Sequence, residues 1–144
     1  MQKFKSPPAK LDADDLARLS EVFRRYADVQ AVYLFGSMAT GKTHKESDID
    51  LALVPRSPAL HQQHLDILAD FVREGFDRVD VIFLDTKNLV LKFEAVRQNR
   101  VIYQTEDFER GAYFSKIARA YWDFQPYLRA QREALKRRIL NGQG

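Results

Sequence analysis

Asp48 and Asp50 are the residues whose type and spacing most directly indicate chemistry in this chain of 144 residues. They stand one residue apart in the run SDIDLALV, and on a strand they point to the same face, opposite to the apolar Ile49, Leu51 and Leu53. Same-face neighbours on a strand lie roughly 6.5 Å apart along it, so both carboxylates can converge on one small cation. The spacing predicts a metal site.

A glycine and a serine precede this pair at a fixed distance. The apolar run VYLF ends in Gly36 and Ser37, and ten residues separate Ser37 from Asp48. Glycine allows the backbone to approach a ligand closely, and backbone amides with a hydroxyl suit the terminal phosphates of a nucleotide. We therefore expect Gly36 and Ser37 to bind phosphate, and Lys42 is the first cation after the serine.

The same stretch also matches a competing motif. GSMATGKT, residues 36–43, fits the phosphate-loop pattern G-x-x-x-x-G-K-[ST] and follows an expected strand. That mechanism requires a helix that begins at the lysine, but only four residues separate Thr43 from Asp48. A parallel crossover needs about a dozen residues or more, so the two strands are expected to be antiparallel and the phosphate loop is disfavoured.

A third carboxylate could complete the site, and three aspartates compete for that role. Asp80 lies near the start of the apolar run VDVIFL, where it could also simply pair with Arg78. Asp77 precedes this run, whereas Asp85 follows it and faces oppositely to Asp80. The histidines at 44, 61 and 64 lack convincing ligand spacing beside a carboxylate.

Together, Gly36-Ser37, ten residues and Asp48-Ile49-Asp50 resemble the nucleotidyltransferase superfamily to which DNA polymerase β belongs. More narrowly, nearly the whole chain is similar to the minimal nucleotidyltransferases that act as antitoxins to HEPN-domain toxins. This resemblance favours Asp80, which has apolar neighbours on both sides, as the third carboxylate. One departure is that many members have a basic residue soon after the serine, whereas Met, Ala and Thr follow it here.

The resemblance implies a reaction and a partner. Asp48, Asp50 and Asp80 would be the catalytic residues and would hold two Mg²⁺ ions, with ATP as the substrate. The AMP group would pass to a tyrosine of a HEPN ribonuclease toxin, which would also be the binding partner. Three alternatives stay open: transfer to an RNA end such as a tRNA 3′ end, a catalytically idle antitoxin that acts by binding alone, and the phosphate-loop NTPase.

The elements expected around this site make an α+β fold of the polymerase β nucleotidyltransferase type. It has a small mixed sheet with helices on one side and a long C-terminal helical segment. Hydrophobic periodicity predicts helices over 11–26, 60–71, 88–98 and 105–140, and strands over 31–35, 49–54, 79–84 and 101–103. In domain terms, we expect a flexible tail over 1–10, a minimal nucleotidyltransferase domain over 11–104, and a helical segment over 105–144 that packs on the domain and on a partner.

The C-terminal segment carries more aromatic residues than one packing face needs. Tyr113, Tyr121, Trp122 and Tyr127 are expected to contact the toxin, because tyrosine and tryptophan are enriched in protein interfaces. Pro126 is expected to kink or break the helix. The basic residues 129, 132 and 136–138 are more typical of a solvated helix face than of an RNA contact.

Composition excludes several classes of protein. There is no cysteine, so neither a disulfide framework nor a cysteine zinc site is possible, and the net charge of +3 does not indicate nucleic-acid binding. No run is apolar and long enough for a signal peptide or a membrane span. These features favour a cytoplasmic protein.

Overall fold

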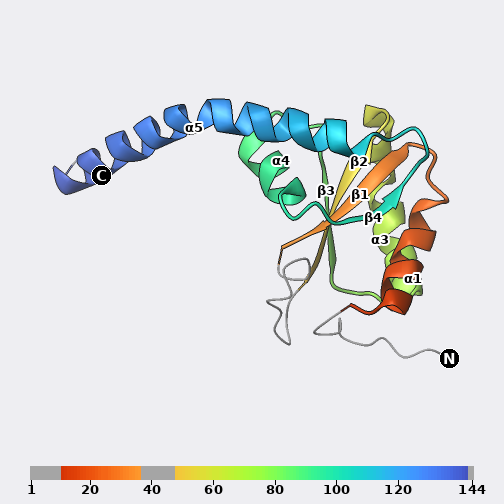
Figure 1. Ribbon diagram of the computed structural model, residues 1–144. Helices are drawn as coiled ribbons and strands as arrows, with labels where there is room; N and C mark the ends of the chain where they lie inside the picture. Colours follow the sequence, from red (N-terminus) through yellow and green to blue (C-terminus); the bar gives the residue numbers. More distant parts are fainter. Residues whose placement is uncertain (1–10, 37–47, 143–144) are drawn as a thin grey trace.

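The computed structural model describes residues 11–36 and 48–142 of the chain. Its centre is a four-stranded sheet in the order β3-β2-β1-β4 (Figure 1). The strands are β1 Val29–Phe35, β2 Ile49–Pro55, β3 Val79–Phe83 and β4 Val101–Gln104. β1 is antiparallel to both β2 and β4, whereas β2 and β3 are parallel, so the sheet is mixed as predicted.

The helices begin and end close to the predicted positions. They are α1 Ala13–Phe23, α3 His64–Arg73, α4 Leu89–Val96 and α5 Arg110–Leu140, and the 3₁₀ helix η1 Pro58–Gln63 leads into α3. Local side chains fix two of the starts. Asp12 and Asp15 form a reciprocal capping box on α1, and the Asn88 side chain accepts a hydrogen bond from the Leu91 amide at the start of α4.

Helices cover both faces of the sheet rather than the single face that was predicted. α1 and α3 pack on one face, over a buried cluster that includes Leu34 and Leu51, while α4 and the first half of α5 pack on the other, over Tyr33 and Ala52. The reason is the sequence of the two central strands. β1 and β2 are apolar at nearly every position, so each of their faces must be buried against another layer.

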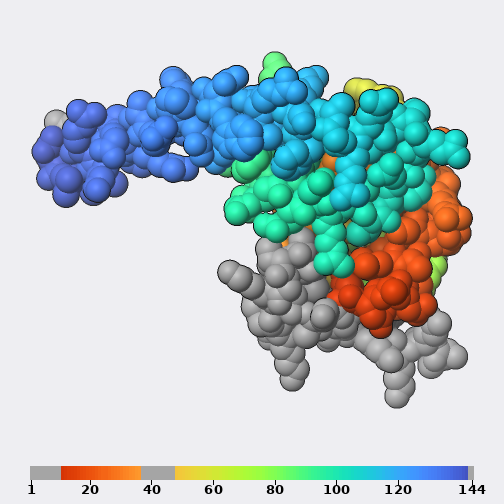
Figure 2. Space-filling view, viewed as in Figure 1, coloured from red at the N-terminus to blue at the C-terminus, as the bar shows by residue number. Residues whose placement is uncertain are grey.

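α5 differs from the prediction at its start and at its proline. It begins at Arg110 rather than at residue 105, because the Thr105 hydroxyl instead bonds the Gln30 carbonyl and the Asp107 carboxylate. Pro126 lies inside the continuous helix, so of the predicted kink or break the break does not occur, and the kink stays a prediction. The far half of α5 extends beyond the body of the molecule (Figures 1 and 2). Within the described residues, no helix combines the length and the apolar character that crossing a membrane requires.

Some predictions lie outside the described residues. They are the tail over 1–10, the positions of Ser37 and Lys42, and most of the segment that matches the phosphate-loop pattern. The predicted antiparallel pairing of the flanking strands is confirmed, however. This pairing removes the strand–helix–strand context that a phosphate loop needs.

Candidate active site

The parallel pairing of β2 with β3 brings two of the predicted carboxylates together. Asp50 and Asp80 are directly paired in the register, one step beyond the pair Ile49 and Val79. The Ile49 amide donates a hydrogen bond of 2.9 Å to the Arg78 carbonyl and fixes this register at the strand starts. Paired residues on neighbouring strands share a face of the sheet, so both carboxylates project from the same face.

Asp48 precedes β2 and is exposed. Two positions later, Asp50 lies within the strand and is half-buried, whereas Asp80 on β3 is exposed. The group therefore runs from the interior of the sheet out to solvent. Such a gradient suits a site that binds a polar substrate from solution.

The backbone of Gly36 packs directly against the Asp50 carboxylate. It follows Phe35, which pairs with Asp50 across β1 and β2, and its φ of +71° lies in the left-handed region that favours glycine. A Cβ atom at this position would collide with the Asp50 carboxylate oxygen and would lie 3.3 Å from its Cγ. Only glycine lets the backbone pass this close to Asp50, while the predicted role of Gly36 in nucleotide binding stays a prediction.

The electrostatics of Asp50 are unusual for an aspartate. Burial, and then the negative charges of Asp80 and Asp48, raise the pKa of the Asp50 carboxyl from 3.8 to about 6. Both causes disfavour the ionised form. A cation bound between these carboxylates would remove the repulsion, which is the electrostatic condition expected of a metal site.

The paired carboxylates of Asp50 and Asp80 are suitable ligands for Mg²⁺. Mg²⁺ takes oxygen ligands and commonly binds through one or two carboxylates together with substrate phosphates. Within residues 11–36 and 48–142, no group of three or more His, Cys, Asp or Glu side chains is gathered closely enough to hold a metal ion. The fit therefore rests on Asp50 and Asp80, and the metal-binding roles of Asp48, Asp50 and Asp80 stay predictions.

The rival carboxylates do not join this pair. Asp85 follows the opposite end of β3, where its carboxylate lies 2.8 Å from His61 Nε2. The His61 ring also packs on Phe83 at 4.3 Å between centroids. Asp77 is exposed and precedes β3. Asp80 is thus the aspartate of the three that the register pairs with Asp50.

The predicted contact residues of α5 divide into two groups. Tyr113 belongs to the body, since it packs against Tyr33 and Phe108 at centroid distances of 6.1 and 5.3 Å. Trp122 and Tyr127 are exposed, at 58% and 56%. The face of α5 that covers the sheet includes Tyr113, which is partly buried, and its predicted contact with a partner stays a prediction.

Tyr121 lies at the boundary between these groups. Its ring stacks on Phe93 of α4, with the centroids 4.1 Å apart and the planes 6° from parallel. Reading the sequence missed this pairing, because periodicity identifies the apolar face of each helix but not which residues of two helices meet. The stack is the last aromatic contact between α5 and another element among the described residues.

Comparisons with known proteins identify the family of this fold. The Polymerase beta nucleotidyltransferase family profile matches residues 17–108. A probable protein adenylyltransferase MntA from Haemophilus influenzae is 34% identical over 76 residues, which are 51% of this chain. The match spans 61% of that relative's length.

Two solved structures share the fold. A toxin–antitoxin structure with AMP-PNP matches with a TM-score of 0.68 and 22% identity, over 88% of this chain and 98% of the other. A chain from the structure of a tri-AMPylated Shewanella oneidensis HEPN toxin in complex with MNT antitoxin matches with a TM-score of 0.61 and 20% identity. The match covers 87% of this chain and 95% of that chain. With the family profile covering more than half of its length, the chain belongs to the polymerase β nucleotidyltransferase family.

Proposed function

We propose that this protein is a Mg²⁺-dependent adenylyltransferase antitoxin that transfers AMP from ATP to a tyrosine hydroxyl of a cognate HEPN ribonuclease toxin. The observation that carries the proposal is the Asp50–Asp80 pair at the sheet end, with Gly36 packed against Asp50. The similarity to an MntA adenylyltransferase and to an AMPylated HEPN complex supports the choice of reaction and partner.

Each residue has a role that follows from its position. Asp48 and Asp50 would hold the metal ions, and Asp80 would complete the ion nearest the acceptor. Bound Mg²⁺ stabilises the charge that develops on the attacking and leaving oxygens. Gly36 and Ser37 would offer backbone amides and a hydroxyl to the terminal phosphates, and Lys42, the first cation after the serine in the sequence, would assist them.

The bonds of the reaction balance without a further reactant. The acceptor oxygen forms a bond to the α-phosphorus of ATP, and the bond from that phosphorus to pyrophosphate breaks. Asp80 is exposed and can accept the hydroxyl proton, which passes on to solvent. Water is abundant at such an open site, so a bound acceptor must exclude it for transfer to outpace hydrolysis.

The test is label transfer with ATP that carries ³²P at either the α- or the γ-phosphate, using the purified chain, Mg²⁺ and its cognate toxin. We expect α-label on the toxin with wild type and none with Asp50→Asn or Asp48→Asn. Undiminished transfer by both variants contradicts the carboxylate mechanism.

The same assay separates the alternatives. With a lysate as the acceptor source, α-label on RNA favours the tRNA-type reaction, and γ-phosphate release without α-transfer favours an NTPase. If neither label moves while the chain still neutralises the toxin, the protein acts by binding alone.

A further inference from the structure

The projecting half of α5, residues 122–140, is here named the arm. It carries five basic and two acidic residues, whereas the whole chain has 23 and 20, so the remainder carries 18 of each sign. The net charge of +3 is therefore the net charge of the arm alone. Every residue from 129 to 140 is exposed, and Figure 2 shows the arm reaching into solvent away from the body.

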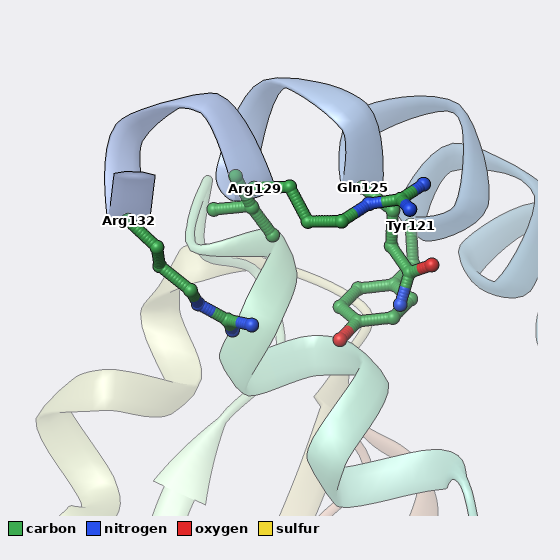
Figure 3. Close-up of a pocket in the computed structure, with 5 residues that line it drawn as sticks. Tyr121, Gln125, Arg129 and Arg132 are labelled. Atoms are coloured by element: carbon green, nitrogen blue, oxygen red, sulfur yellow. The ribbon is translucent and has the colours of Figure 1, made fainter. Parts of the chain in front are cut away.

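A polar pocket lies where the arm leaves the body. It has a volume of about 210 Å³ and is lined by Tyr121, Gln125, Leu128, Arg129 and Arg132. These residues recur at three- and four-residue spacing, so they share one side of the helix. Figure 3 shows the Arg129 guanidinium beside Tyr121 and Gln125, with the Arg132 side chain projecting away from the helix one turn further on.

The two guanidinium groups are free to receive an anion. Among the described residues, neither Arg129 nor Arg132 makes an ion pair or a side-chain hydrogen bond. One lining residue of the pocket, Tyr121, is held in place because its ring stacks on Phe93 of α4. A guanidinium fork matches the two oxygens of a carboxylate, so each of the two arginines can bind one.

The rest of the arm indicates that the occupant is a protein. Large apolar side chains stand exposed along it: Trp122 at 58%, Tyr127 at 56%, Leu135 at 51%, Ile139 at 63% and Leu140 at 75%. Exposed aromatic and aliphatic residues among arginines are typical of protein interfaces. A second copy of this chain is a poor occupant, because two arms of charge +3 repel each other.

We propose that the arm binds an acidic segment of the protein that accepts AMP, with carboxylates of that segment paired to Arg129 and Arg132. This inference rests on the proposed function, since it describes how the same reaction selects its acceptor. The arm would raise the local concentration of the acceptor hydroxyl near the sheet end and would contribute nothing to the bond-forming step.

Direct binding tests the recognition chemistry without any catalysis. The probes are a fluorescein-labelled glutamate-rich helical peptide and an oligouridylate of equal charge, measured by fluorescence anisotropy. The pocket variant is Arg129→Glu with Arg132→Glu, and the matched control is Arg137→Glu with Arg138→Glu. The control makes the same charge change on the same helix, outside the pocket.

We expect the pocket variant to bind the peptide about tenfold more weakly than wild type, and the control about twofold more weakly. In the transfer assay, the pocket variant should raise KM for the toxin by a similar factor and leave kcat and KM for ATP unchanged. Equal losses in the two variants overturn the proposal, because they reduce the arm to a diffuse basic surface. Tighter binding of oligouridylate than of peptide also overturns it, in favour of RNA.

These readouts separate the two proposals. If wild type binds the peptide through Arg129 and Arg132 but transfers no AMP to the toxin, the proposed function fails while the pocket chemistry stands. If wild type transfers AMP with the same KM as the pocket variant, the acceptor is selected elsewhere and this inference fails alone.

Discussion

Asp50 and Asp70 are both withdrawn from solvent, but the protein surrounds them in opposite ways. Asp70 of α3 is 6% exposed and receives a hydrogen bond of 2.5 Å from the Tyr26 hydroxyl and another of 2.5 Å from Arg73. The Arg25 guanidinium also lies 3.8 Å from the Asp70 carboxylate. Asp50 has instead the negative charges of Asp48 and Asp80 as its electrostatic neighbours.

The difference separates a carboxylate that serves the fold from one that serves a site. A buried charge is tolerated when donors and cations compensate its lost hydration, as they do at Asp70. At Asp50 the charges nearby increase that cost, and a protein gains nothing in stability from such an arrangement. The uncompensated group is therefore the functional candidate.

Gly36→Ala should break the site with the largest effect. The added methyl collides with the Asp50 carboxylate and places alanine at a positive φ, so Asp50 is displaced. We expect AMP transfer to fall by about 100-fold or more, since small misplacements of reacting groups have effects of this size. Gly111→Ala is the control, because no atom lies within 4 Å of a Cβ there. Wild-type transfer by Gly36→Ala would show that Asp50 is not a metal ligand.

Asp70→Ala should damage stability and spare the chemistry. Its removal leaves the Tyr26 hydroxyl without its partner and removes the ion pair of Asp70 with Arg25, which keeps its pair with Glu74. We expect a loss of about 2–3 kcal/mol in the free energy of unfolding, measured by urea denaturation. Under conditions where the variant is folded, ATP-dependent transfer should match wild type. A fall in kcat without a fall in stability would contradict the assignment of Asp70 to the fold.

Asp50→Asn should have the opposite effects to Asp70→Ala: it should abolish AMP transfer and raise the free energy of unfolding. Because the pKa of Asp50 is raised to about 6, ionisation of this group opposes folding. Ionisation of Asp50 leaves the free energy of unfolding unchanged below the unfolded-state pKa of about 3.9. It lowers this free energy increasingly as pH rises, and the loss is complete above about pH 6.

Without Mg²⁺, the thermal midpoint of Asp50→Asn should therefore exceed that of wild type by a few degrees at pH 8. The advantage should shrink as pH falls from 6 towards 4. Calorimetry at several pH values measures it, and added Mg²⁺ should stabilise wild type alone. A variant less stable than wild type at pH 8 would contradict the electrostatic account of this site.

Two phenylalanine substitutions should give the smallest effects, with different signs. Tyr26→Phe deletes the hydroxyl that bonds Asp70 and should lower the free energy of unfolding by about 1 kcal/mol. Among the residues that the structure describes, the buried Tyr33 hydroxyl has no hydrogen-bond partner, and burial raises its pKa to about 12. Tyr33→Phe should therefore be neutral or stabilising by up to about 1 kcal/mol, in matched urea titrations. Equal losses for the two variants would mean that the Tyr33 hydroxyl does have a partner.

Much of the fold could be predicted because its signals are local. The shortness of the connection after Gly36 predicted the antiparallel pair. Asn88 and Asp12 stand where helix caps are expected, and α4 and α1 begin beside them. The two-sided cover of the sheet was missed, because apolar strands indicate burial on both faces but do not specify which helices supply it.

By itself, the sequence determined the site's chemistry: a glycine, two carboxylates at strand spacing, and a third in an apolar run. Only the tertiary structure decided which distant groups meet. The β2–β3 register set Asp80 rather than Asp85 beside Asp50, and the packing of α5 divided its tyrosines, with Tyr113 in the body and Tyr127 in solvent. The physical reason is that spacing fixes the direction of a side chain along its own element, while pairing and packing between elements fix its neighbours.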